Sequence, residues 1–170
     1  MSMRALIVAV NLALAAIFAT AALAADPHIR WADIIGIIQA GNPVGSGAGQ
    51  VTGGGQPWST TKGSATVNLN NGDIHFRVEG LVLAGGNGIG TRGAIAEVKG
   101  TLVCDTNGSA GAGSSTLVDT PLVPLSAQGD AEFHGSVGPL PGACLSEADI
   151  AFVVRNVGGN WIANGAVRRP

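Results

Sequence analysis

The sequence contains no tyrosine, only two cysteines and few charged residues. Of its 170 residues, 12% are charged and 4% are aromatic, and nine basic residues stand against eleven acidic ones. The net charge is −2, so the chain has no strongly basic surface with which to bind nucleic acid. It also has no C-x-x-C, H-E-x-x-H or H-x-H spacing, and we therefore predict neither a metal site nor a cofactor.

After residue 25 the sequence lacks any apolar run long enough to cross a membrane. Such a run occurs only over residues 5–25, and it ends in Ala22-Leu23-Ala24, which matches the A-x-A pattern of a cleavage site. We therefore predict that residues 1–25 are a cleaved signal peptide, with an uncleaved membrane anchor as the alternative. The protein would then be exported, either to a periplasm or out of the cell, with no transmembrane segment left after cleavage.

The remaining residues, 26–170, have the length of a single domain. They are rich in glycine, because they hold all 27 glycines of the sequence where roughly 10 would be average for this length. Glycine, serine, asparagine and threonine gather in three stretches, 41–55, 84–93 and 105–115, which we expect to be surface loops.

Between these loops, apolar and polar residues alternate as they do in β-strands. The clearest element is a hairpin of residues 66–70 and 73–83, joined by Asn71-Gly72, because this dipeptide adopts the positive φ values of a two-residue turn. In its second arm Ile74, Phe76 and Val78 would share the inward face. A strand over 96–104 would turn another set of residues inward, namely Ala96, Val98, Gly100, Leu102 and Cys104.

The fold class follows from the number and spacing of these runs. Residues 28–38 suit a short helix or a strand, and their β-branched content favours the strand. The sequence predicts an all-β fold: a single-domain antiparallel β-barrel or β-sandwich of about eight or nine short strands, with the choice between the two left open. Further strands are expected at 116–118, 131–137, 150–156 and 161–167.

The two cysteines are predicted to form a disulfide. Cys104 and Cys144 are the only pair in the sequence, and in an oxidising compartment an even number of cysteines indicates a disulfide rather than metal ligands. A catalytic or redox-active cysteine is the alternative. Neither cysteine has a histidine beside it in the sequence, and we therefore favour the disulfide.

Two histidines form the centre of a candidate binding site. His75 and His134 each adjoin a phenylalanine that we expect to point inward, so both should point outward. If their strands are neighbours, they would form a polar patch with Arg77, Glu79 and Glu132, capable of binding or acid–base chemistry. The alternative is that these five residues are the solvated faces of two ordinary amphipathic strands. We assign no catalytic residue.

Two other patterns carry little functional weight. Gly88-Ile89-Gly90-Thr91-Arg92-Gly93 matches G-x-G-x-x-G, but the residues after it predict a strand and not the helix that a dinucleotide site needs. The tryptophans at 31, 58 and 161 could stack against a sugar, although partly buried core positions explain them more simply.

Four stretches carry a resemblance to a known family. They are VEGLVLAGGN at 78–87, KGTLVCD at 99–105, PLVPLSAQGDA at 121–131 and WIANGA at 161–166. Through them the sequence resembles a family of small exported bacterial proteins without assigned function, over residues 29–167. The resemblance implies a bacterial, exported, single-domain β protein with its cysteine pair bridged. It implies no catalytic or ligand-binding residues.

Two functions of different class fit the sequence. The first is a non-catalytic structural or binding module whose partner is an unknown protein or a small apolar ligand. The second is a small β-barrel enzyme, an isomerase, cyclase or hydrolase, that uses His75, His134 and a carboxylate such as Glu79 or Glu132. The low charge and the absence of a catalytic motif favour the module.

Overall fold

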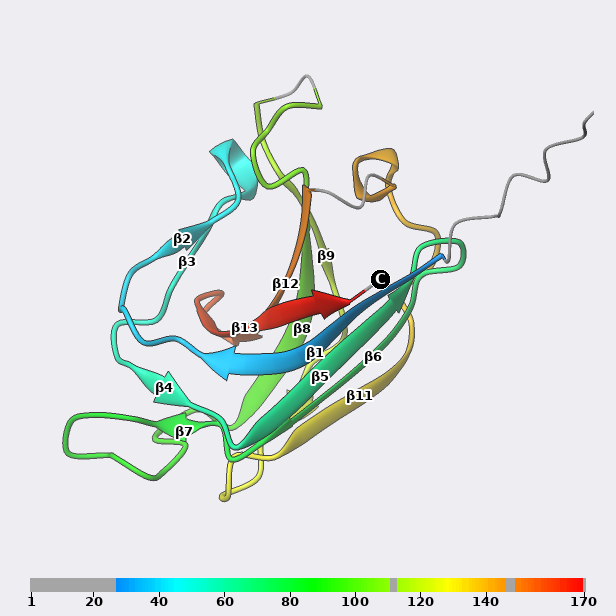
Figure 1. Cartoon of the computed structure of the whole chain (residues 1–170). Helices are drawn as coiled ribbons and strands as arrows, with labels where there is room; N and C mark the ends of the chain where they lie inside the picture. The colour runs from blue at the N-terminus through cyan, green and yellow to red at the C-terminus, as the bar shows by residue number, and fades with distance from the viewer. Residues whose placement is uncertain (1–26, 111–112, 146–148, 170) are drawn as a thin grey trace, which may run out of the picture.

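A computed structural model describes residues 27–110, 113–145 and 149–169 and confirms the all-β fold (Figure 1). Helical structure in these residues is short and includes two 3-10 turns, η1 (Gly47–Gly49) and η2 (Gly142–Cys144). In this part of the chain no helix has the length and apolar character needed to cross a membrane. The predicted signal peptide, residues 1–25, lies outside the described residues.

One antiparallel sheet of nine strands dominates the fold. Its strands are β1 (His28–Gly36), β5 (Lys62–Asn68), β6 (Asp73–Glu79), β8 (Glu97–Cys104), β9 (Thr116–Asp119), β10 (Val123–Pro124), β11 (Ala131–Ser136), β12 (Ile150–Asn156) and β13 (Trp161–Arg169). Eight of them follow the order β10-β8-β12-β13-β1-β5-β6-β11, and β9 pairs with β8 next to β10.

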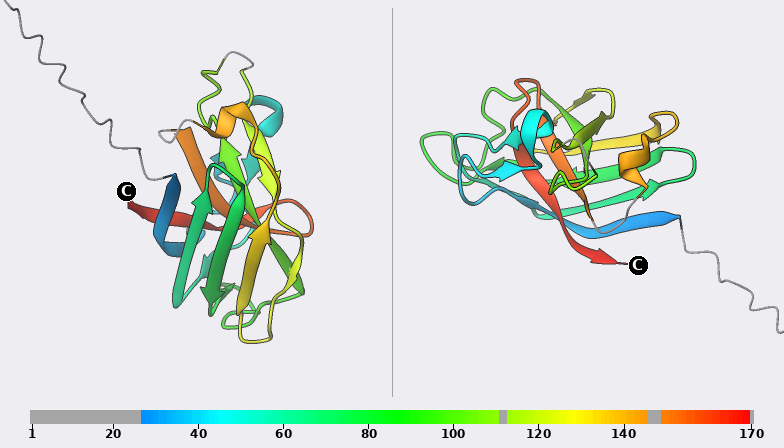
Figure 2. Two further views of the ribbon diagram at one scale, coloured as in Figure 1. Left: turned by 90° about the vertical axis from the view of Figure 1, so that its right-hand side faces the viewer. Right: turned by 90° about the horizontal axis from the view of Figure 1, so that it is seen from above.

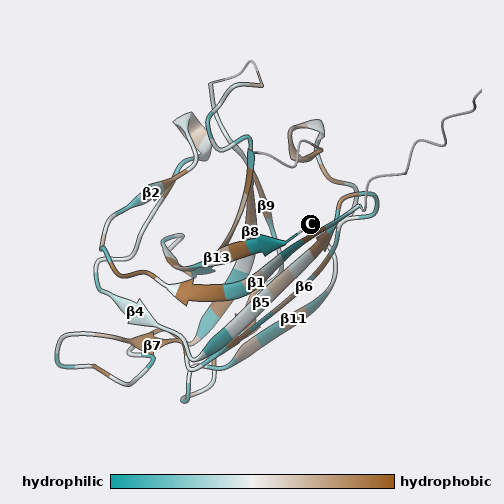
Figure 3. Cartoon of the chain, in the orientation of Figure 1, coloured by the Kyte–Doolittle hydropathy of each residue, from teal (hydrophilic) through white to brown (hydrophobic). Residues whose placement is uncertain are grey.

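This sheet curls into a half-barrel, so that its two halves face each other across the core. One half contains β5, β6 and β11, and Figure 2 shows β12 and β13 of the other half running at an angle to them. Hydrophobic and hydrophilic residues alternate along many of these strands, as Figure 3 shows by colour. Two further pairs of strands, β2 (Pro43–Val44) with β3 (Val51–Thr52) and β4 (Trp58–Ser59) with β7 (Val82–Leu83), lie outside the large sheet.

Strand β1 joins the two halves. It pairs with β5 over residues 28–31 and with β13 over residues 30–36. Two glycines make room for it: a Cβ at Gly63 would lie 2.6 Å from Ile34, and a Cβ at Gly165 would lie 2.6 Å from the ring of Trp31. The curl of the sheet therefore depends on the close approach of β1 to glycine in both neighbouring strands.

The hairpin of β5 and β6 is confirmed, but its turn is longer than the two residues expected. Val67 pairs with Ile74, which leaves residues 69–72 as the loop. Leu69 is buried and anchors this loop to the core, while the side chain of Asn71 accepts a hydrogen bond from the backbone N–H of Asp73. Gly72 alone in this loop has a positive φ, and the anchored Leu69 explains why Asn71-Gly72 does not form the tight turn by itself.

The inward face of β8 is confirmed in part. Val98, Gly100, Leu102 and Cys104 are buried, whereas Ala96 precedes the strand and is exposed. Val103, on the other face, is also fully buried because the 41–55 stretch covers it, and a Cβ at Gly45 would lie 2.9 Å from its side chain.

The 41–55 stretch contains a hairpin and is packed against the stretch 105–115. It forms β2, η1 and β3. The backbone N–H of Ser46 donates to the Ser115 hydroxyl at 2.9 Å, and the N–H of Ser115 donates to the Ser46 carbonyl at 3.0 Å. At Gly49 a Cβ would lie 1.8 Å from the Ser115 carbonyl oxygen. Glycine is needed here for close packing between two backbones.

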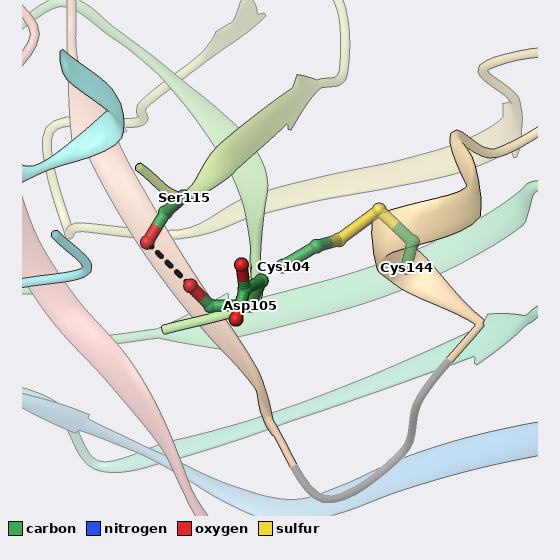
Figure 4. Close-up of a disulfide and its surroundings, with 4 residues drawn as sticks. All are labelled: Cys104, Asp105, Ser115 and Cys144. Atoms are coloured by element: carbon green, nitrogen blue, oxygen red, sulfur yellow. Dashed lines mark hydrogen bonds between the residues drawn. A yellow bond between two sulfur atoms is a disulfide. The ribbon is translucent and has the colours of Figure 1, made fainter. Parts of the chain in front are cut away.

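The predicted disulfide is present and fully buried. Cys104 at the end of β8 is bonded to Cys144 of η2 (Figure 4). The next residue, Asp105, is also buried, and its carbonyl accepts a hydrogen bond from the Ser115 hydroxyl at 2.8 Å. The bond therefore fixes the segment around η2 to the strand at the centre of one half of the sheet.

Candidate functional site

Strands β6 and β11 are neighbours, which is the condition on which the predicted polar patch depends. They pair antiparallel, with Phe133 opposite Phe76 and His134 opposite His75. Phe76 is fully buried and Phe133 is half-buried, with their rings stacked at a centroid distance of 6.2 Å. Both histidines are exposed on the outer face, as the alternation of the strands predicts.

The two histidines contact each other and a carboxylate. Their ring centroids lie 5.2 Å apart. The Nε2 atom of His75 lies 3.0 Å from Oε1 of Glu132, within hydrogen-bonding distance. The side chains of His75 and Glu132 are 50% and 58% exposed, so this group is reached directly from solvent.

The other two predicted residues lie on the same face. Arg77 is opposite Glu132 in the β6–β11 register, but its guanidinium pairs with Glu79 at 2.9 Å. The structure thus brings the five predicted residues onto neighbouring positions of two paired strands. We call His75, Arg77, Glu79, Glu132 and His134 the outer patch.

A hollow of about 210 Å³ adjoins the outer patch. All three histidines of the chain line it, because His28 of β1 joins His75 and His134 there. Sequence reasoning missed His28, although its position in a predicted strand was a usable signal. Strand pairing brings His28 close to the other two histidines, because His28 is opposite Asn68 of β5 and β5 in turn pairs with β6. The remaining lining residues are Thr66, Asn68, Asp73 and Ile74.

A second hollow, of about 330 Å³, extends the same face toward the other end of β5. Its charged residues are Asp33, Lys62, Arg77 and Glu79, so that it carries both signs of charge. Arg77 and Glu79 belong to the outer patch as well. The outer face of β1, β5, β6 and β11 is therefore polar and hollowed on both sides of the outer patch.

The ring of His75 lies beside a carboxylate and not beside a nucleophilic side chain in the described part of the chain. Among the described residues, the hydrogen bond that the His75 ring makes is with the carboxylate of Glu132, and not with a serine, threonine or cysteine. An activated nucleophile needs such a contact with its base. In the same part of the chain, no three His, Cys, Asp or Glu side chains stand together as a ready metal site.

The tryptophans and the glycine-rich motif do not form sites in the described chain. Trp31, Trp58 and Trp161 are buried, in agreement with core positions rather than with a sugar-stacking surface. The indole of Trp161 donates to the Asn42 carbonyl at 2.8 Å. The motif at 88–93 lies in turns and leads into strand β8, so the helix that a dinucleotide site requires does not follow it.

A second polar cluster, which the sequence did not reveal, surrounds Asp119 of β9. Its carboxylate accepts hydrogen bonds from Lys99, from the Thr101 hydroxyl at 2.6 Å and from Arg155 at 3.2 Å. Burial alone would raise the pKa of Asp119, but the bonds from Lys99 and Thr101 and the charges of Lys99 and Arg155 hold it below its usual value of 3.8. Since these groups come from β8, β9 and β12, we interpret the cluster as a link between strands.

Comparisons with known proteins found no match: no family model, no curated protein and no solved structure is similar to this chain.

Proposed function

We propose that the protein is a non-catalytic, exported binding module, and that it binds its partner on the outer face of β1, β5, β6 and β11. The observation that carries this proposal is the gathering of all three histidines around one hollow, on the same face as the rest of the outer patch. Surfaces that converge several polar groups on a concave site are typical of ligand recognition.

The strands beneath this face support the proposal because they hold the side chains in place. Both β5 and β11 pair with β6 along nearly its whole length. Under it, Phe76 packs against Phe133 and against Phe152 of the opposite half of the sheet. A binding site on such strands loses little conformational entropy when it takes up a ligand.

The contents of the core argue for a polar partner rather than a small apolar ligand held inside the sheet. The rings of Trp31 and Phe76 each lie 5.6 Å from the ring of Phe152, so aromatic side chains fill the space between the two halves. The outer face instead offers imidazoles, carboxylates and guanidinium groups. A protein surface or a small polar molecule matches this chemistry.

Export is part of the proposal and has two supports. Residues 1–25 have the pattern of a signal peptide, and the buried Cys104–Cys144 disulfide is typical of oxidising compartments.

An enzyme is the second candidate, and the hydrogen bond between His75 and Glu132 favours it. A carboxylate that orients an imidazole is a common arrangement for a general base. In this reading, substituting His75→Ala together with His134→Ala would leave the fold intact and abolish turnover of a substrate.

Native mass spectrometry tests the binding module directly. The protein would be isolated from the exported fraction of the cells that make it, as wild type, as a Lys62→Ser/Arg77→Ser variant of the outer face, and as a Glu97→Gln control. Glu97 is an exposed residue of β8 on the other half of the sheet. We expect a bound partner with the wild type and the control and its loss from the Lys62→Ser/Arg77→Ser variant. A partner kept by that variant, or none with the wild type, would contradict the proposal.

A further inference from the structure

The two paired histidines have the spacing of ligands to one metal ion. His75 and His134 are directly opposite each other on antiparallel strands, and their ring centroids lie 5.2 Å apart. Two imidazoles bound to a tetrahedral ion through bonds of about 2.0–2.1 Å place their centroids roughly 5 Å apart. The strand register therefore keeps the two rings near enough to share one ion once the His134 ring has turned.

Glu132 supplies a third donor atom at a suitable position. Its Oε1 lies 3.0 Å from Nε2 of His75. Around a tetrahedral ion with bond lengths of about 2.0–2.2 Å, neighbouring ligand atoms are roughly 3.3 Å apart. An ion could therefore take the place of the proton between these two atoms with little movement of either side chain.

The surroundings leave Glu132 available and the ion accessible. Arg77, the residue opposite Glu132, directs its guanidinium to Glu79 at 2.9 Å. The side chains of His75 and Glu132 are about half exposed, so water or another ligand can complete the coordination. Among the described residues no three His, Cys, Asp or Glu side chains are already placed to hold a metal ion, so binding requires the exposed His134 ring to turn toward the ion. Rotamer changes of exposed side chains take picoseconds to nanoseconds.

We propose that His75, Glu132 and His134 form a binding site for a first-row transition-metal ion, with Zn²⁺ as its representative. Two imidazoles and one carboxylate suit Zn²⁺, whereas Mg²⁺ and Ca²⁺ prefer sites made wholly of oxygen ligands. The inference rests on the proposed function in that it uses the same face, and it names a chemical class of ligand for it.

Isothermal titration calorimetry of the oxidised protein with ZnCl₂ tests this site. We expect saturable binding of one ion per chain, and MgCl₂ should give no binding under the same conditions. His75→Ala and His134→Ala should each weaken Zn²⁺ binding by at least about tenfold, and Glu132→Gln should weaken it by about tenfold, as the loss of a ligand or its orienting partner does elsewhere.

His28→Ala is the matched control, because His28 lines the same hollow but is not part of the site. This variant should bind Zn²⁺ as the wild type does. Circular dichroism of each variant establishes that it is folded before its affinity is compared. Absence of Zn²⁺ binding by the folded wild type, or unchanged affinity in the His75→Ala/His134→Ala double variant, would overturn the proposal.

The two experiments distinguish an error in the proposed metal site from an error in the proposed binding face. If Zn²⁺ does not bind but mass spectrometry still finds a partner that Lys62→Ser/Arg77→Ser removes, the metal site alone is wrong. If Zn²⁺ binds at the histidines and no partner depends on Lys62 or Arg77, the wider binding face is wrong.

Discussion

The rings of Phe76 and Phe152 come from opposite halves of the curled sheet and lie 5.6 Å apart. Gly100 of β8 lies against both of them, since a Cβ at this position would be 2.8 Å from each ring. The absence of a side chain at Gly100 thus allows the two phenylalanines to meet. The contact between Phe76 and Phe152 lies on the inner face of β6 and so supports the residues on its outer face.

Replacing Gly100 by alanine should therefore destabilise the protein. The added methyl group has to displace two fully buried rings, and overpacking of this kind costs about 1–3 kcal/mol of unfolding free energy. Urea denaturation measures the loss. Gly55→Ala is the matched control, because a Cβ at Gly55 has no neighbour within 4 Å. Equal stability of the two variants would show that Gly100 is not needed for the packing.

Phe76→Ala should cost more stability than Phe133→Ala. Phe76 is fully buried between Phe133 and Phe152, and removing such a ring costs about 3–5 kcal/mol. Phe133 is only half-buried and leaves a smaller cavity. Chemical denaturation of both variants gives the two values, and the reverse order would mean that the inner and outer faces of β6 and β11 are assigned wrongly.

The disulfide should contribute strongly to stability. It closes a long loop, with a sequence separation of 40 residues between Cys104 and Cys144. The loss of chain entropy in the unfolded state corresponds to about 4 kcal/mol. A Cys104→Ala/Cys144→Ala variant should unfold at a lower urea concentration than the oxidised wild type. Identical midpoints would contradict a stabilising role.

Stability in acid should depend on Asp119. The folded state holds its pKa below the usual 3.8, so its contribution is complete at pH values above the unfolded pKa and is lost as the pH falls through the folded one. Asp119→Asn should therefore reduce stability near neutral pH and flatten the decline in acid. Denaturation midpoints between neutral pH and pH 2 show this, with Glu97→Gln as control. Parallel curves for wild type and Asp119→Asn would refute it.

The sequence predicted the fold class and much of the outer patch because both depend on local alternation. Ile74, Phe76 and Val78 point inward and are buried, which places His75 and Arg77 outside. The contact between His75 and Glu132 needed one further fact, the pairing of β6 with β11. Pairing depends on contacts between residues distant in the chain, and alternation along single strands does not determine it.

Features made by long-range packing were missed for the same reason. The burial of Val103 depends on the 41–55 stretch folding over β8. The place of His28 beside the other two histidines depends on β1 pairing with β5. The four-residue turn at 69–72 depends on the burial of Leu69 in the core. The Asn71-Gly72 dipeptide favours a two-residue turn, so the sequence did not predict the longer one.

The most direct test of the binding face is a two-dimensional ¹H–¹⁵N NMR spectrum of the oxidised protein, recorded with and without a dialysed extract of the exported fraction of its own cells. A partner on the outer face should shift amide signals of β5, β6 and β11, with the largest changes around His75 and His134. Shifts centred on β8, β9 and β12 instead, or an unchanged spectrum, would contradict the assignment of this face as the binding surface.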